Sequence, residues 1–223
     1  MDTYNNKIVM VTGASSGIGR AMAIDLAAQG AELILTARSH DLLDSLANEI
    51  KEGGGKAHVF VGDLAQPGSA EALHQQVIEA KLHVDLLVNN AGYGIPTAFH
   101  ETSMEDEEDF IRVLGIAVIA LSKVFLPNMI SNGYGRIMIV SSVAAFAPPS
   151  TIQALYGPIK TFMNRFSDAL NTNYNHKGIT STAVCPGFTV TNFHQSSGVQ
   201  NEMDKVPGFM KFSAKRIAEE DVI

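Results

Sequence analysis

Short apolar segments rich in valine, isoleucine and leucine recur along the chain, and segments of helical period separate them. Such continuously apolar segments are typical of parallel strands that are buried on both faces. Six strands are predicted at Lys7–Val11, Glu32–Thr36, Ala57–Val61, Val84–Asn89, Arg136–Ser141 and Ile179–Val184. Regular alternation of strands and helices predicts an α/β fold with one doubly wound parallel sheet, because right-handed crossovers restrict how such units can pack.

The helices between these strands are bounded by glycine stop signals and by one capping motif. Gly30 ends the first helix, and Gly53 to Gly55 end the second. Later helices are expected from about Ser69 to Ala80, Met104 to Ser131, Tyr156 to Asn175, and from near Ala214 onward. Leu42, Leu43, Leu46 and Ile50 share one face of the second helix, and Ser103 with Asp106 fits a capping box.

The stretch from Phe188 to Ala214 is less regular than the rest. We interpret it as a long loop with short helices, of the kind that often covers a substrate, within a single domain of residues 1–223. Its apolar residues either pack this lid onto the core or offer an apolar surface to a hydrophobic carbonyl or alcohol. They are Phe193, Val199, Met203, Val206, Phe209, Met210 and Phe212.

Composition and charge exclude several classes of protein. With 46% apolar and 17% charged residues, the chain is expected to fold. A net charge of −7 without a basic run argues against nucleic acid as a partner. The single cysteine, Cys185, lies in an apolar run, which predicts a structural thiol in a reducing compartment. No apolar run approaches the ~18 residues of a membrane span, and no metal site is indicated, so we expect a cytoplasmic protein.

A glycine-rich turn follows the first strand and precedes a helix, with the sequence Thr12–Gly13–Ala14–Ser15–Ser16–Gly17–Ile18–Gly19. Glycines allow a sharp turn and a close approach of phosphate to the backbone. The free N–H groups and the positive dipole end of the helix favour a pyrophosphate there. The position of the turn, more than the glycines alone, indicates a dinucleotide site.

The spacing G-x-x-x-G-x-G resembles that of the short-chain dehydrogenase/reductase family, whose fold is Rossmann-like. Three further motifs resemble the same family in the same order: Asn89–Asn90–Ala91–Gly92, Tyr156-x-x-x-Lys160, and Pro186–Gly187-x-x-x-Thr191. The resemblance extends over nearly the whole chain and implies an NAD(P)-dependent oxidoreductase acting on alcohol or carbonyl groups. It implies cofactor contacts from Gly13, Ser15, Ser16, Gly17, Ile18, Gly19, Asp63, Leu64, Asn90, Ala91, Gly92, Tyr156, Lys160, Pro186, Gly187, Thr189 and Thr191.

The end of the second strand bears on the choice between NADP(H) and NAD(H). An acidic residue there would hydrogen-bond the ribose 2′-hydroxyl and repel a 2′-phosphate. Ala37 occupies the expected acidic position, and Arg38 follows it with a guanidinium suited to phosphate oxygens. We therefore favour NADP(H), although Arg38 stacked on adenine or exposed to solvent is the alternative, and Ser16 stands where NADP-preferring relatives often have a basic residue.

Carbonyl reduction needs a hydride from nicotinamide and a proton for the oxygen. A free tyrosine has a pKa of about 10, and a nearby ammonium lowers it by stabilising the phenolate. Tyr156 and Lys160 are four residues apart and so share one helix face. The resemblance makes Tyr156 the general acid/base, with Ser142 as the third catalytic residue. Strand alternation leaves Ser141 as the alternative to Ser142.

Four features depart from the family pattern. Ser142 precedes Tyr156 by fourteen residues, where the family usually has thirteen. Leu114 stands where the family commonly has an asparagine that holds a water beside the lysine, on a stripe with Phe110, Ala117, Val118, Leu121 and Phe125. Pro158 suggests that the helix begins near Gly157 and holds Tyr156 less firmly. The chain stops at Ile223, so either the form is truncated or the sheet lacks the family's last strand.

Two functions therefore remain open. The first is an active NADP(H)-dependent reductase or dehydrogenase. The second is a nucleotide-binding protein of the same fold with weak or no catalysis, such as a sensor or scaffold. The resemblance also implies a homodimer that pairs the fourth and fifth helices.

Overall fold

The computed structural model describes residues 4–148, 154–190 and 211–221. Its centre is a parallel sheet with the strand order β3-β2-β1-β4-β5-β6. The strands are β1 (Ile8–Thr12), β2 (Glu32–Thr36), β3 (Lys56–Val59), β4 (Leu86–Asn89), β5 (Gly135–Val140) and β6 (Ile179–Val184). The doubly wound sheet is confirmed, and each predicted strand is present. The bounds of β2 and β6 are as predicted, and those of the other four strands differ by one or two residues, most clearly in β3, which ends at Val59 rather than Val61.

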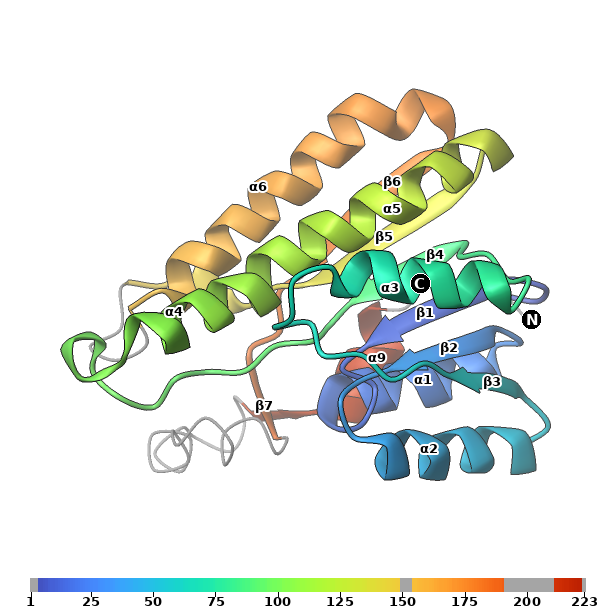
Figure 1. The fold of residues 1–223 in the computed structure, drawn as a ribbon, viewed down its shortest axis with the longest axis horizontal. Coiled ribbons are helices and arrows are strands. Elements are labelled where there is room, and N and C mark those ends of the chain that lie inside the picture. The colour runs from blue at the N-terminus through green and yellow to red at the C-terminus, as the bar shows by residue number, and fades with distance from the viewer. Residues whose placement is uncertain (1–3, 149–153, 191–210, 222–223) are drawn as a thin grey trace.

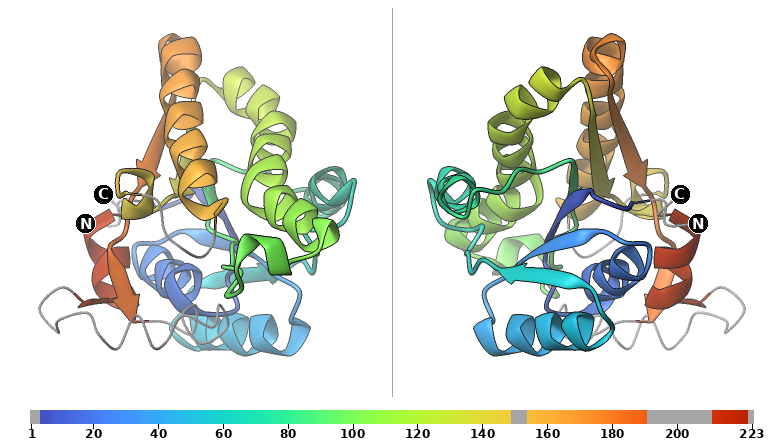
Figure 2. Two further views of the ribbon diagram at one scale, coloured as in Figure 1. Left: turned by 90° about the vertical axis from the view of Figure 1, so that its left-hand side faces the viewer. Right: turned by 90° about the vertical axis from the view of Figure 1, so that its right-hand side faces the viewer.

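Helices cover both faces of the sheet (Figure 1). One face carries α1 (Gly17–Ala28), α2 (His40–Glu52) and α9 (Ala214–Asp221), and α9 packs beside α1 (Figure 2). The other carries α3 (Ser69–Glu79), α5 (Ala117–Asn132) and α6 (Tyr156–Tyr174). The two apolar clusters of the core follow this division, because alternate residues of each strand point to opposite faces. Leu33 and Leu35 pack with α1 and α2, whereas Ile34 between them packs on the α3 side.

The long fourth helix is interrupted, which the sequence did not predict. It consists of α4 (Met104–Ile111), one π-helical stretch η2 (Arg112–Ile116) and α5. The expected capping box is present at its start: the Ser103 hydroxyl accepts a hydrogen bond from Asp106 N, and the Asp106 carboxylate accepts one from Ser103 N. The expected inward stripe is confirmed from Phe110 to Phe125, all of whose members are buried.

Length and composition alone would also suit this helix to a membrane, since Met104–Asn132 spans 29 residues and includes a long, mostly apolar section. Charged residues interrupt its apolar positions, so no unbroken apolar run predicted a segment of this length. In the fold the helix packs Leu121, Phe125 and Met129 into the core beside the sheet. It is therefore a core helix of the α/β fold.

Three other expectations need correction or qualification. Leu42 does not lie on the buried face of α2: it is 52% exposed, while Leu43, Leu46 and Ile50 are buried. The helix that carries Tyr156 begins at Tyr156 itself, and Pro158 falls in its first turn, where no N–H donor is needed. Within residues 188–214, Phe188–Val190 (β7) and Lys211–Ser213 (β8) pair as a second, two-stranded sheet. Most of the expected lid, with Thr191, lies outside the described residues.

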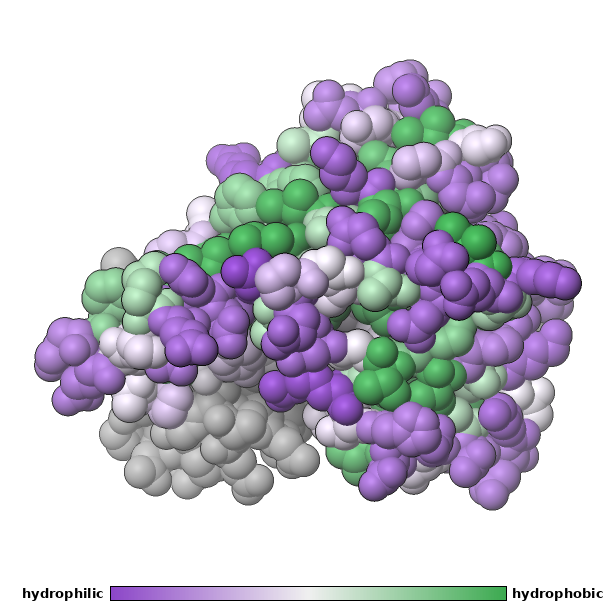
Figure 3. Space-filling view, in the orientation of Figure 1, coloured by the Kyte–Doolittle hydropathy of each residue, from purple (hydrophilic) through white to green (hydrophobic). Residues whose placement is uncertain are grey.

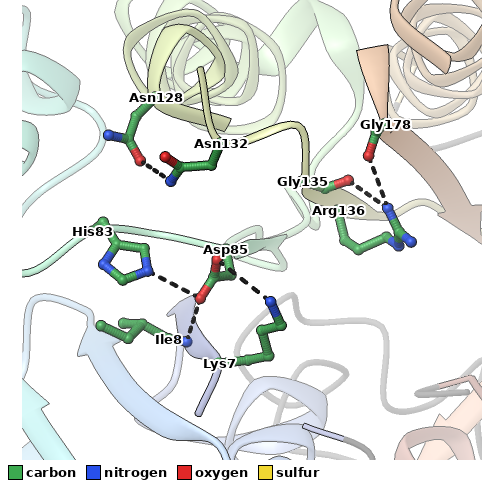
Figure 4. A network of polar contacts seen from close by, with 9 residues as sticks. All are labelled: Lys7, Ile8, His83, Asp85, Asn128, Asn132, Gly135, Arg136 and Gly178. Carbon is green, nitrogen blue, oxygen red and sulfur yellow. Dashed lines mark hydrogen bonds and ion pairs between the residues drawn. The ribbon is translucent and has the colours of Figure 1, made fainter. Parts of the chain in front are cut away.

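A polar cluster ties the amino ends of the central strands together, at the edge of the sheet away from the glycine turn (Figure 4). Asp85 is 5% exposed and accepts a 2.9 Å hydrogen bond from Ile8 N, at the start of β1. His83 Nε2 lies 3.2 Å and Lys7 Nζ 4.0 Å from the same carboxylate. Arg136 Nη1 donates to the carbonyl oxygens of Gly135 and Gly178, which joins β5 to the start of β6. No motif in the sequence indicated this cluster.

Candidate active site

The glycine turn joins β1 to α1 at the carboxyl end of the sheet, between β1 and β4, where the strand order reverses. Open α/β sheets bind their ligands at such a point. Gly13 has φ +65° and Gly17 has φ +58°, a backbone region that favours glycine. A Cβ on Gly13 would lie 2.9 Å from both Asn90 Nδ2 and Ala91 Cα, so the turn and the segment after β4 need the missing side chain.

Asn90 and Thr12 hold the two loops together. Asn90 Nδ2 donates to the carbonyl oxygens of Thr12 at 2.9 Å and Gly13 at 3.2 Å. In return, the Thr12 hydroxyl accepts from the backbone N of Asn90 at 2.9 Å and Ala91 at 3.0 Å. Asn90 is therefore a structural link beneath the site as well as part of its wall.

A cavity of about 620 Å³ runs from Arg38 past the glycine turn to Tyr156 and Lys160. It brings together nearly all residues predicted to contact the cofactor: Gly13, Ser15, Ser16, Gly17, Ile18, Arg38, Asp63, Leu64, Asn90, Ala91, Gly92, Tyr156, Lys160, Pro186, Gly187 and Thr189. Gly19 does not line the cavity. It is buried, and a Cβ there would collide with the Asn90 amide.

The cavity fits an extended nucleotide cofactor with a phosphate at the start of α1. Ser16 is the N-cap residue of α1, but its side chain makes no capping hydrogen bond. The first N–H groups of the helix are thus not satisfied by the cap side chain, and the positive dipole end faces the turn. This arrangement suits a bound anion.

Lys160 lies at the other end of the cavity and is 7% exposed. Its Nζ donates a 2.7 Å hydrogen bond to the carbonyl oxygen of Val140 and lies 5.5 Å from the centroid of the Tyr156 ring. Burial lowers the pKa of Lys160 to about 8, against a smaller raising effect from Cys185. The ammonium is thus poised to change its protonation near physiological pH.

Tyr156 behaves differently from the sequence-based expectation. Burial raises its pKa above the ordinary value, and a hydrogen bond with the Ser142 side chain partly offsets that rise. The expected lowering by Lys160 is not found, so that prediction is wrong. The reason is that removing the phenolate from water outweighs the local stabilising contacts.

The two neighbouring serines have different roles, as alternation along β5 requires. Ser141 is 3% exposed, and its hydroxyl donates a 3.1 Å hydrogen bond to the backbone carbonyl of Lys160. Ser142 lines the cavity, hydrogen-bonds Tyr156, and accepts from Ala144 N at 3.1 Å, at the start of the short helix η3 (Val143–Ala145). The geometry therefore places Ser142 beside the phenol and makes Ser141 an anchor for α6.

Leu114 faces the cavity from the π-helical stretch and is 2% exposed. It packs against Gly92, where an added Cβ would meet Leu114 Cγ at 3.6 Å. An apolar side chain therefore fills the space where relatives were expected to hold a water. Cys185 is half-buried, and its thiol lies 3.6 Å from Asn164 Oδ1.

Sequence reasoning missed several residues of the cavity wall. Tyr93, Asp109 and Val113 line it from the segment after β4 and from the fourth helix. The π-helical stretch changes the helical register between Asp109 and α5, and no residue pattern signalled that change. Tyr93 follows the Asn-Asn-Ala-Gly motif directly, so its position next to the site was available from the sequence.

The glycine turn at the reversal of strand order, with Tyr156 and Lys160 on one helix above it, defines a doubly wound α/β protein of the nucleotide-binding class. The model of the short chain dehydrogenase family matches residues 7–202. The chain belongs to this family.

Among known proteins, the chain is 33% identical to a fatty acyl-CoA reductase of Acinetobacter baylyi over 186 residues, which cover 82% of this chain and 62% of that protein. It is 30% identical to the oxidoreductase UcpA of Escherichia coli over 97% of this chain and 82% of the relative. The chain spans from about a third to two thirds of the length of several other curated relatives that it matches.

Solved structures agree with the fold. A short-chain dehydrogenase from Sphingobium yanoikuyae in complex with NADPH has a TM-score of 0.89 at 29% identity, covering 97% of this chain and 82% of the other. L-Sorbose reductase from Gluconobacter frateurii, complexed with NADPH and L-sorbose, has a TM-score of 0.88 at 28% identity, covering 100% and 90%.

Proposed function

We propose that this protein is an NADP(H)-dependent oxidoreductase that interconverts a carbonyl compound and a secondary alcohol. The observation that carries the proposal is the convergence of Ser142, Tyr156 and Lys160 on one end of a cavity whose other end is lined by Arg38. The NADP-bound relatives support a nicotinamide cofactor, and Arg38 supports a 2′-phosphate.

Different residues along the cavity border different parts of the cofactor. The α1 N-terminus and Ser15 to Ile18 hold the pyrophosphate, Arg38 holds the 2′-phosphate, and Asp63 with Leu64 borders the adenine. Asn90 to Gly92, Pro186, Gly187 and Thr189 border the nicotinamide half. When bound, the nicotinamide supplies or accepts the hydride.

Tyr156 moves the proton. In reduction, its phenol donates a proton to the developing alkoxide, while Ser142 hydrogen-bonds the same oxygen and holds it in place. Lys160 Nζ lies 5.5 Å from the centroid of the Tyr156 ring, and the Ser142 hydroxyl is the group that lowers the pKa of the phenol. In oxidation, the phenolate accepts the proton from the alcohol.

The experiment that tests this function is carbonyl-dependent NADPH oxidation by the wild type and Tyr156→Phe. Loss of a general acid is expected to lower the rate by about 10²- to 10⁴-fold, with NADPH binding unchanged. Because Phe keeps the ring and loses only the hydroxyl, an undiminished rate would refute Tyr156 as the proton donor.

The second candidate function is nucleotide binding with little catalysis, and Leu114 is the observation that favours it, because its side chain cannot hydrogen-bond a water beside Lys160. A clear thermal shift with NADPH and no turnover across a panel of aldehydes and ketones would favour this candidate.

We further propose a cytoplasmic homodimer formed through α5 and α6. Hydrophobic residues gather on the outer face of α5 (Figure 3). Ile116, directly before α5, and Phe162 on α6 are 47% and 46% exposed. Apolar patches of this kind commonly mark an interface. Sedimentation of the wild type and Phe162→Glu would show a dimer and a monomer if the proposal holds, and the same mass for both if it does not.

A further inference from the structure

A small pocket separates the beginning of α4 from the beginning of α6. Glu107 and Phe110 of α4 line it on one side, and Leu155 and Tyr156 line it on the other. The remaining walls come from Ile95, Thr97, Phe99 and Ala154. At about 10 Å³ the pocket has room for about one water molecule. It is therefore too small for a substrate group, and its role concerns the residues that line it.

Glu107 combines charge with burial in the wall of this pocket. It is 6% exposed, whereas the neighbouring acids Glu105, Asp106 and Glu108 are exposed. The Thr102 hydroxyl donates a 2.6 Å hydrogen bond to Glu107 Oε1. Within the described residues, neither the hydrogen bonds nor the ion pairs of Glu107 include a basic side chain. Because one hydroxyl is little compensation for a carboxylate removed from water, the pocket is where further compensation has to come from.

The helix on the other side of the pocket supplies that compensation. Leu155, the N-cap residue of α6, makes no capping hydrogen bond with its side chain, and the first turn of α6 contains no acidic residue. The N–H groups and the positive dipole end at the start of a helix favour a negative charge nearby. Among the described residues that line the pocket, Glu107 is the acidic one. One water in the pocket can join its carboxylate to the start of α6.

The same two helices hold the proposed proton donor. Tyr156 is the first residue of α6, so its position depends on how this end of the helix is held. Phe110 follows Glu107 by about one turn of α4 and is 1% exposed. Its ring centroid lies 6.5 Å from that of Tyr156. Phe110 therefore supports the ring of Tyr156, while Glu107 faces the backbone from which that ring projects.

We infer that Glu107 is a positioning residue for Tyr156: its carboxylate, through one water molecule in the pocket, binds the start of α6 and fixes the backbone of the proton donor. The inference rests on the proposed role of Tyr156. Displacement of a reacting group by about 1 Å can cost about 10²-fold in rate, so loss of this support is expected to lower turnover.

The first test compares Glu107→Leu and Glu107→Gln in the reduction of cyclohexanone by NADPH. Leucine removes both carboxylate oxygens, so kcat should fall by about tenfold or more, while the dissociation constant for NADPH stays within about twofold. Glutamine has an amide that still binds Thr102 and a water, so kcat should return to within about threefold of the wild type. An unchanged kcat in Glu107→Leu, or an equal loss in both variants, would overturn the inference.

Thermal unfolding separates positioning from a merely structural role. Glu107→Leu removes a buried charge that has no cationic partner among the described residues, and the Thr102 hydroxyl keeps the Phe99 carbonyl oxygen 2.9 Å away as an acceptor. The variant should therefore unfold at the temperature of the wild type or above it, although it turns over more slowly. A loss of stability that parallels the loss of rate contradicts the inference.

Glu108→Leu is the matched control, because it makes the same change at an adjacent exposed residue that lines neither cavity. Its kcat is expected to stay within about twofold of the wild type. If Glu108→Leu lowers kcat as much as Glu107→Leu does, the effect belongs to the charge of α4 as a whole and the assignment to Glu107 fails.

Failure of the proposed function would look different. If the wild type reduces neither cyclohexanone nor a wider panel of carbonyl compounds, the reductase proposal fails, and hydrogen exchange decides the role of Glu107. The amides of Tyr156, Gly157 and Ile159 should exchange about fivefold faster in Glu107→Leu than in the wild type, the factor expected from loss of one helix cap, while those of α5 stay unchanged. Equal exchange at the start of α6 in both proteins refutes the inference.

Discussion

Lys160 donates a 2.7 Å hydrogen bond from its ammonium to the carbonyl oxygen of Val140, the last residue of β5. The backbone of Lys160 is held as well, because the Ser141 hydroxyl donates a hydrogen bond to the Lys160 carbonyl oxygen. Val140 and Ser141, at the carboxyl end of the sheet, thus bind the side-chain nitrogen and the backbone carbonyl of Lys160. The head group is placed beside Tyr156 without a hydrogen-bonded carboxylate, and burial lowers its pKa to about 8.

This lowered pKa predicts a pH-dependent effect of Lys160→Met on stability. Between pH 8 and about 10.5 the unfolded chain binds the lysine proton and the folded protein does not, so the wild type gains stability as pH rises. Below pH 8 both states are protonated, and burying the charge destabilises the fold by about 3 kcal/mol at most. The variant should therefore be more stable than the wild type at pH 7, with the advantage shrinking toward pH 10.

Urea unfolding at pH 7, 8.5 and 10 measures this difference. Lys177→Met serves as the control, since Lys177 is exposed and should show no such trend. A stability difference that stays constant over this range would mean that the buried ammonium is not the cause.

Arg38 is predicted to set the cofactor preference. Arg38→Gln removes the guanidinium that would meet the 2′-phosphate, so the dissociation constant for NADPH should rise by about tenfold or more, while that for NADH stays within about twofold. Thermal shifts over a range of nucleotide concentrations measure both, because a ligand at 100 times its dissociation constant adds about 2.7 kcal/mol. A parallel loss for both nucleotides would instead place Arg38 on the adenine.

Leu114→Asn is predicted to lower the stability of the fold and to raise the turnover rate. Leu114→Asn buries an amide in an apolar site and should lower the free energy of unfolding by about 1 to 3 kcal/mol. The same amide can hydrogen-bond a water near Lys160, so kcat should rise. Leu114→Ala creates space without an amide, and a rise in kcat in that variant as well would assign the effect to space rather than to proton transfer.

The polar cluster at the amino ends of the strands is predicted to affect stability and leave nucleotide binding unchanged. Asp85→Ala leaves the buried N–H of Ile8 without its acceptor and should cost about 2 kcal/mol, measured by urea unfolding. Asp85→Asn keeps an acceptor and should cost less. The dissociation constant for NADPH is expected to stay within about twofold, because this cluster lies at the opposite edge of the sheet; a large loss of affinity would contradict that separation.

Most of the fold was predictable from the sequence, because continuous apolar runs and glycine stops reflect burial on two sides and chain reversal. The glycine turn, Asn90 and the pair of Tyr156 and Lys160 were predictable for the same reason, since their chemistry depends on spacing along one chain. Burial of Glu107 and exposure of Leu42 were not, because each depends on how a helix is rotated against its neighbours. The raised pKa of Tyr156 likewise depends on desolvation, which no local pattern encodes.

The π-helical stretch Arg112–Ile116 holds about one residue more per turn than the α-helical segments on either side of it. An extra residue at this point is therefore absorbed without rotating either segment against the sheet. Loss of one residue would restore a regular α-helix and leave Phe110 beside Tyr156, while Leu121 and Phe125 stayed in the core. Related proteins can thus differ by one residue here and keep both halves of the long helix in place.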